Sequence, residues 1–171
     1  MANTESERRT KQRLLDLLKK YHQLDRWTFT EELVIRDDGI SHSHPVLTLA
    51  TNILSREDEE FVSVYVHENI HHFLSQHPEG FHAAMKDVRS LYPKVPAGRA
   101  SGGARDEDST YVHLIVGYLE LVAMTDIFGR DSAIKTLGKH DYYRWVYKTV
   151  LEETDALKSM VEKNGLTPNS S

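Results

Sequence analysis

Helical periodicity dominates this chain and is interrupted by one β-like stretch before residue 52. Over residues 4–24, Leu14, Leu17, Leu18 and Tyr21 fall on one stripe, with basic residues elsewhere, which predicts an amphipathic helix. Similar patterns, ended by proline or glycine, predict further helices over residues 56–76, 81–91, 110–128, 132–137 and 141–163.

The stretch 27–51 has a different character. β-Branched and aromatic residues fill 27–35, Asp37-Asp38-Gly39 is a turn signal, and residues 46–51 read as a second strand. We therefore expect a small antiparallel sheet packed by the helix over 56–76. The predicted fold class is α+β and mostly helical, with one domain over residues 1–166 and a disordered tail over residues 167–171.

Charge and composition narrow the functional classes. The chain has 171 residues, with 21 Lys+Arg against 26 Asp+Glu and a formal charge of −5, which argues against a nucleic-acid partner. No apolar run approaches a membrane span of about 20 residues, and residues 3–13 are polar, unlike a secretory signal. We expect a cytoplasmic protein with no membrane partner. The sequence does not indicate an oligomeric state.

Histidine is the residue type that carries the candidate chemistry. The chain contains ten histidines and no cysteine, so disulfides, thiol catalysis and Cys-type zinc sites are excluded. A metal ion in this protein must therefore be held by imidazole and carboxylate groups.

The predicted helix 56–76 contains His67-Glu68-Asn69-Ile70-His71, an H-E-x-x-H motif. His67 and His71 are one helical turn apart on one face, so both imidazoles can reach the same cation. Glu68 is rotated by about 100° from His67, from where its carboxylate can contact a metal-bound water and take its proton. The motif predicts two ligands and a general base.

Residues 64–73 resemble the active-site helix of the zincin metallopeptidases. The resemblance implies Zn²⁺ as the cofactor, Glu68 as the catalytic base and hydrolysis of a peptide bond in an extended peptide or protein substrate. It also implies an edge strand that pairs with the substrate, and residues 46–51 are the strand best placed by order for that part.

A zinc site of this kind needs a third protein ligand, and three residues are candidates. His77 has the metzincin spacing, but Leu74 replaces the glycine that would turn the helix, so a continuing helix would carry His77 about 120° past His71. Glu120 interrupts an otherwise apolar helix, where an ionised group is costly unless it is paired or bound to metal. We therefore favour His67, His71 and Glu120 as the metal ligands, which resembles the His₂Glu site of the gluzincins.

His113 lies seven residues before Glu120, on the same helical face and about 10 Å away. We expect it to act in catalysis as a donor to the substrate carbonyl or the oxyanion. The alternatives are that it orients a ligand, that it packs in the core, or that it is itself the third ligand with Glu120 as its support.

Two departures from the gluzincin pattern are evident. Met124 stands where those enzymes often have an aspartate, and the nearest one, Asp126, is about 120° round the helix from Glu120. The chain is also short, so it resembles only a minimal gluzincin core. The sequence thus predicts a zinc metallopeptidase, and the alternative is a zincin-shaped regulatory or interaction module that binds metal without cutting. The loop 93–108 is long enough to be a lid.

Overall fold

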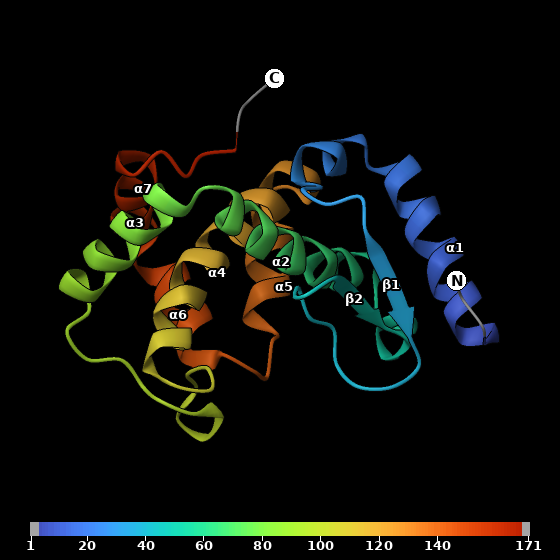
Figure 1. Cartoon of the computed structure of the whole chain (residues 1–171), viewed down its shortest axis with the longest axis horizontal. Helices are drawn as coiled ribbons and strands as arrows, with labels where there is room; N and C mark the ends of the chain where they lie inside the picture. Colours follow the sequence, from blue (N-terminus) through green and yellow to red (C-terminus); the bar gives the residue numbers. More distant parts are fainter. Residues whose placement is uncertain (1–3, 169–171) are drawn as a thin grey trace.

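The computed structural model describes residues 4–168. It is mostly helical, and two helices, α2 (Asp58–Gln76) and α4 (Glu107–Phe128), lie in the middle of the molecule (Figure 1). On one side of them lie α1 (Glu5–Lys20), β1 (Leu33–Arg36) and β2 (Leu47–Ala50). On the other side lie α3 (Pro78–Leu91), α6 (Arg144–Glu152) and α7 (Thr154–Lys163), while α5 (Arg130–Gly138) follows α4. Short 3₁₀ turns occupy His22–Trp27, Thr51–Ile53 and Arg99–Ser101.

Helices α2 and α4 form the core and are buried on nearly all sides. Residues 61–70 of α2 are all buried, as are residues 114–121 of α4. An all-round apolar helix of this kind is typical of a protein interior. Helix α4 is also long and apolar enough to cross a membrane, but it is mostly buried inside the protein, and core helices meet the same test. Its burial therefore accounts for its composition.

Helix α6 packs closely on α4 at a glycine. A Cβ atom added at Gly117 would lie 3.3 Å from the Val150 side chain, so the bare backbone there lets the two helices approach. Tyr147 of α6 also contacts this glycine. The close packing brings α6 up to the α4 surface from which Glu120 projects.

The expected antiparallel sheet is wrong in one respect: β1 and β2 run parallel, with Leu33 opposite Leu47 and Arg36 opposite Ala50. The turn at residues 37–39 does reverse the chain, but the returning segment makes only one antiparallel bridge, between His42 and Thr48. A second reversal at residues 44–46 then sends β2 back in the direction of β1. Two successive turns, rather than one, set the strand direction.

The helix predictions are confirmed in position, with different ends. The predicted helix over 141–163 is two helices, α6 and α7, which meet at Glu153. Asp106 is the N-cap of α4 and forms a reciprocal capping box with Ser109. Helix α5 covers the predicted 132–137 turn. Leu166 is buried at the end of the expected domain, and the predicted disordered tail extends to residues 169–171, which lie outside the described residues.

Candidate metal centre

The H-E-x-x-H motif lies on the central turns of α2. His67 and Glu68 are buried and His71 is partly exposed, so the motif lies where the core opens to the surface. The rings of His67 and His71 have centroids 5.2 Å apart, as the one-turn spacing predicts. Asn69, between them, turns the other way, and its side-chain oxygen accepts a hydrogen bond from the backbone of Phe29. The helix thus points one face at the site and another at the packing behind it.

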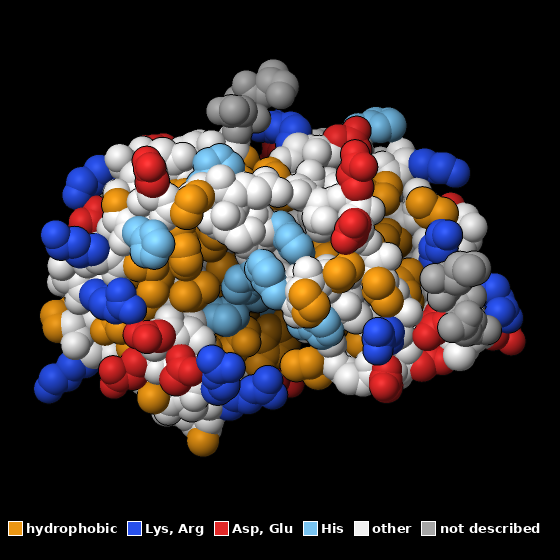
Figure 2. Space-filling model, viewed as in Figure 1, with side chains coloured by type: hydrophobic (Ala, Val, Ile, Leu, Met, Phe, Trp, Pro, Cys, Tyr) orange, Lys and Arg blue, Asp and Glu red, His pale blue; other side chains and the backbone are white. Residues whose placement is uncertain are grey.

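His113 of α4 completes a group of three histidines that could hold a metal ion. One ring nitrogen from each of His67, His71 and His113 lies within 4.8 Å of the other two. The ring of His113 is 5.4 Å from that of His67 and 5.3 Å from that of His71, measured between centroids. Figure 2 shows histidine side chains gathered in a hollow near the middle of one face. Among the described residues, this is the group with metal-ligand geometry.

Glu120, which the sequence favoured as the third ligand, is not in that group. Its Oε2 lies 2.9 Å from Nδ1 of His67. The other ring nitrogen of His67, Nε2, is therefore the one available to the group of three histidines. The two central helices run antiparallel: His113 meets His71 and His67, and Glu120, two turns further along α4, meets His67 and Ser63. The seven residues between His113 and Glu120 therefore carry the carboxylate about 10 Å along α4, to the far side of His67.

His113, which one of the alternatives made the third ligand, belongs to the group that could hold a metal ion. Glu120, the support in that alternative, is hydrogen-bonded to His67 rather than to His113. The Nδ1 of His113 lies instead 2.6 Å from the backbone oxygen of Ser109, one turn earlier on α4.

A hydrogen-bond network surrounds Glu120, whose side chain is only 1% exposed. Ser63 donates to Oε1 at 2.5 Å and Tyr147 donates to Oε2 at 2.8 Å, alongside the bond from His67. Since the Ser63 hydroxyl proton points to Glu120, its oxygen accepts from Nε2 of His140, 3.0 Å away. Every partner donates toward the carboxylate. This arrangement fixes the proton of His67 on Nδ1 and leaves Nε2 free to face a cation.

Burial and charge shift the pKa values in this network. Burial opposes ionisation of both partners, yet the hydrogen bond and charge of the other group prevail, so the pKa of His67 is raised and that of Glu120 is lowered. The contact between the two side chains therefore favours the charged form of each.

The other groups around the site are governed mainly by desolvation. Burial, reinforced by the neighbouring charge of His67, lowers the pKa of His71 and brings that of His113 to about 4, so both imidazoles are neutral and have a lone pair available. Burial raises the pKa of the Glu68 carboxyl to about 7, against the lowering effect of His67. A neutral imidazole is the form that binds metal, so the electrostatics suit a cation site.

The remaining histidines lie elsewhere. His77, the metzincin alternative, ends α2 with its Nδ1 2.8 Å from the backbone oxygen of Phe73 and its ring against the Phe73 ring. His44 stacks on His72 outside the group, at 4.8 Å between centroids. Asp126, whose role was open in the sequence, accepts a hydrogen bond from the indole of Trp27 and so stabilises the packing of the 3₁₀ turn on α4.

A cleft opens beside the histidines, with a volume of about 730 Å³ counted out to the solvent. His67 and Glu68 form one wall, and two tyrosines, Tyr142 and Tyr143, form another. The remaining lining comes from the 40–56 region and from the 92–106 loop, namely Ile40, Ser41, Asn52, Ile53, Arg56 and Arg99, together with Val64 of α2. The Glu68 carboxylate therefore faces space that a second molecule can enter.

Tyr143 has an unusual backbone conformation at this cleft. Its φ is 55°, in the left-handed region that non-glycine residues seldom adopt, and its ring is 4.2 Å from that of His113. Strain of this kind persists where the surroundings hold a residue in place. Tyr142 and Tyr143 both pack against the hydrophobic core and line the cleft.

The strand expected to pair with a substrate does not have a free edge at its centre. β1 lies along one side of β2, and on the other side Thr48 exchanges two backbone hydrogen bonds with His42. Ile40 and Ser41, just before that bridge, are the residues of this region that line the cleft. The 40–42 segment thus lies between β2 and the site.

Sequence reasoning missed Ser63 and Tyr147. Ser63 is one turn before His67 and is a polar residue within an apolar run, which was a usable signal. Tyr147 gave no such signal, because its contact with Glu120 depends on how α6 packs on α4. Arg56 and Arg99 were also passed over, since they are far apart in the sequence and from the motif.

Comparisons of the chain with protein-family models, with curated proteins and with solved structures found no match. The geometry of the site is therefore the basis for assigning a function.

Proposed function

We propose that this protein is a zinc-dependent metallopeptidase in which His67, His71 and His113 hold the metal and Glu68 is the general base. The observation that carries the proposal is the convergence of three imidazole nitrogens within 4.8 Å of one another, beside a carboxylate that faces an open cleft. The resemblance of residues 64–73 to the zincin helix agrees with it. The third ligand is a histidine, so the proposed site is His₃ rather than His₂Glu.

The donor set fits zinc. Tetrahedral zinc with Zn–N distances of about 2.0–2.1 Å places its ligand nitrogens about 3.3 Å apart, so these nitrogens need to close by no more than about 1.5 Å. Rotation of partly exposed side chains such as His71 covers this distance. Three neutral or carboxylate-supported imidazoles and an open fourth position are typical of catalytic rather than structural zinc sites.

The division of labour follows from the positions of the side chains. When bound, zinc supplies Lewis acidity, which acidifies a water molecule and polarises a carbonyl group. Glu68 then takes the proton of the attacking water and passes it to the leaving amine. Glu120 holds the His67 ring in place and keeps its proton on Nδ1. The hydroxyls of Tyr142 and Tyr143, which line the cleft, are available as donors to the substrate carbonyl oxygen.

Metal analysis of matched variants tests the ligand set. We expect the wild type to bind one zinc per chain and His113→Ala to lose it, whereas His77→Ala, which removes a histidine outside the group, retains it. Zinc loss in His77→Ala with retention in His113→Ala would contradict the proposed site.

Glu68→Gln tests the reaction. This variant should keep zinc and its fold but lose cleavage of a mixed peptide library by at least about 100-fold, the size of a general-base contribution. An unchanged rate would remove the base role. A wild-type protein that binds zinc and cuts no peptide would instead support the non-catalytic metal-binding module.

A further inference from the structure

Two arginines line the cleft beside the metal centre, and neither has a carboxylate partner. Arg56 follows the 3₁₀ turn after β2, and Arg99 begins the 3₁₀ turn in the 92–106 loop. Within residues 4–168, neither guanidinium forms an ion pair, although other arginines of the chain do: Arg13, Arg26, Arg89 and Arg105. Both arginines therefore place in the cleft a positive charge that no carboxylate among residues 4–168 neutralises through an ion pair.

The acidic residues close to Arg56 in the sequence are engaged elsewhere. Asp58 pairs with Arg13 and Lys20, and Glu57 and Glu60 both pair with Lys139. Arg13 also donates hydrogen bonds to the backbone oxygens of Leu54 and Arg56, which fixes the chain from which the Arg56 side chain emerges. The Arg56 side chain is therefore directed to the cleft on a held backbone rather than neutralised locally.

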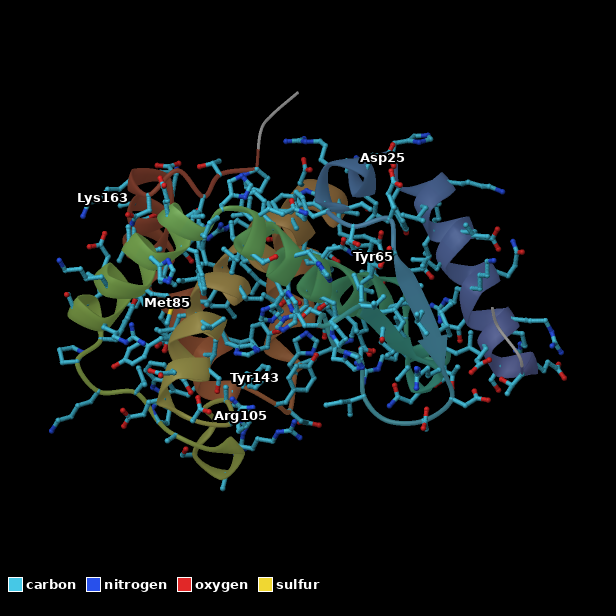
Figure 3. All side chains as sticks on the ribbon, viewed as in Figure 1. Asp25, Tyr65, Met85, Arg105, Tyr143 and Lys163 are labelled. Atoms are coloured by element: carbon cyan, nitrogen blue, oxygen red, sulfur yellow. The ribbon has the colours of Figure 1, made fainter. Side chains whose placement is uncertain are left out.

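Both arginines act on the tyrosines across the cleft. Burial raises the pKa of Tyr142, and the charge of Arg56 opposes that rise. Burial likewise raises the pKa of Tyr143, which the charges of Arg99 and Arg105 oppose. Figure 3 labels Tyr143 and Arg105 near each other, at the end of α4 where the 92–106 loop joins it. Figure 2 shows basic side chains at the rim of the histidine hollow.

We propose that Arg56 and Arg99 recognise a carboxylate of the peptide substrate close to the bond that is cut. A guanidinium presents a planar fork of N–H donors that matches a carboxylate, and charge-assisted hydrogen bonds of this kind are stronger than neutral ones. The inference rests on the proposed peptidase function and adds the class of substrate: a peptide with an acidic side chain or a free C-terminal carboxylate at this position.

The shared cleft limits where that carboxylate lies. Glu68 and the two arginines line the same cleft, so the recognised carboxylate lies in the part of the substrate next to the scissile bond.

The test uses quenched fluorescent peptides that differ in one charge. In each pair, glutamate is replaced by glutamine at one of three positions on either side of a central bond, and every peptide is made with a free and with an amidated C-terminus. For zinc-loaded wild type, we expect kcat/KM to be about 10-fold or more higher for one charged form. Preference for the internal glutamate identifies a side-chain carboxylate, and preference for the free acid identifies the C-terminal one.

Arg56→Gln and Arg99→Gln should each collapse this ratio toward one. Arg89→Gln is the control: it removes the same charge from a residue that pairs with Asp108 and does not line the cleft, so the ratio should persist. Equal kcat/KM values for charged and neutral peptides in wild type, or a ratio that survives in both Arg56→Gln and Arg99→Gln, would overturn the inference while leaving the peptidase proposal intact.

A binding measurement separates this inference from the proposed activity. Zinc-loaded Glu68→Gln protein is titrated calorimetrically with the charged and neutral peptides, so affinity is read without turnover. Tighter binding of the charged peptide that depends on Arg56 and Arg99 supports carboxylate recognition even if wild type cuts nothing, in which case the peptidase proposal fails alone. Equal affinities would overturn the recognition proposal.

Discussion

Helix α2 carries charged groups in two very different settings. In its first turn, Asp58 pairs with Lys20 while their side chains are 31% and 59% exposed. Two turns further on, His67 pairs with Glu120 while the side chains are 11% and 1% exposed. The two pairs have nearly equal N···O distances, 2.8 and 2.9 Å. The two ion pairs therefore differ in their exposure to solvent and not in the distance between their charged atoms.

The difference lies in what happens when one partner is lost. At the first turn, water replaces a missing partner, and the acidic side chains are also favoured by the helix N-terminus. In the middle of α2 the Glu120 side chain is only 1% exposed, so the carboxylate depends on Ser63, His67 and Tyr147 for its three hydrogen bonds. The exposed charges therefore make only small contributions to stability, whereas the buried Glu120 carboxylate also orients His67, a proposed metal ligand.

The largest expected effect is that of Glu120→Ala on the metal-free protein. Removing the carboxylate leaves the Ser63 and Tyr147 hydroxyls and the His67 ring without their acceptor in a dry interior. Breaking a buried pair in this way costs about 3–5 kcal/mol of the free energy of unfolding. Urea denaturation at pH 7 measures it, and Glu59→Ala, at the exposed end of α2, should change that free energy by no more than about 0.5 kcal/mol. Similar losses of unfolding free energy in Glu120→Ala and Glu59→Ala would show that the buried and the exposed charges contribute equally to stability.

A smaller loss is expected for Tyr147→Phe. The substitution keeps the ring that packs against Gly117 and removes only the hydroxyl that donates to Glu120. A hydrogen bond to a charged group contributes about 1.5–3 kcal/mol, so the free energy of unfolding should fall by that amount. Tyr142→Phe removes a hydroxyl at the cleft instead and is the control. A Tyr147→Phe protein as stable as wild type would show that Ser63 and His67 suffice for the carboxylate.

Zinc affinity should respond to the same carboxylate. Glu120→Gln keeps the shape of the side chain but removes its charge, so the His67 ring is held less firmly and is a weaker donor. Loss of such a supporting group weakens metal binding by about 10- to 100-fold, or about 1.4–2.7 kcal/mol. Competition with a chelator of known affinity measures the change. If Glu120 were itself a ligand, the loss would equal that in His113→Ala, and this result would restore the sequence-based assignment.

The two ends of α2 also differ in how well the sequence predicted them. The one-turn spacing of His67 and His71 is local, so the sequence was enough to place both rings on one face. The sequence also marked Glu120 as special, because an ionised residue in an apolar helix requires a partner. Which partner it has depends on the antiparallel crossing of α2 and α4, which places His113 among the three histidines and Glu120, two turns further on, beside His67 and Ser63.

The sheet and the last helix show the same limit. Residues 37–39 were correctly identified as a turn, but the strand direction depended on a second reversal at residues 44–46, where a proline alone does not say which way the next strand runs. The periodicity of residues 141–163 continues through Glu153, although the chain bends there to let α7 pack against both α3 and α4. Turns and helical periodicity are local properties that a sequence can predict. The direction of β2 and the break between α6 and α7 depend instead on tertiary packing.

The smallest expected effect concerns the exposed pair and depends on pH. The hydrogen bond from Lys20 lowers the pKa of Asp58 in the folded state, with a further contribution from Arg13. A lowered folded-state pKa means that the stabilisation is complete above the unfolded value near 4 and is lost as the pH falls through the folded value. Asp58→Asn should therefore reduce the free energy of unfolding at pH 7 by about 0.2–1 kcal/mol, and its effect should shrink as the pH falls from the unfolded value through the lowered folded value.

The control for that variant is Glu59→Gln, which removes a charge from the same turn, where no ion pair is found among residues 4–168. It reports the contribution of the helix N-terminus alone, so the excess loss in Asp58→Asn over Glu59→Gln is the share of Lys20 and Arg13. Denaturation at several salt concentrations sharpens the result, since screening should shrink this excess at high salt. If neither high salt nor low pH reduces the extra loss of unfolding free energy in Asp58→Asn, Asp58 behaves as a buried charge does. The proposed contrast between the exposed and the buried pair on α2 would then be contradicted.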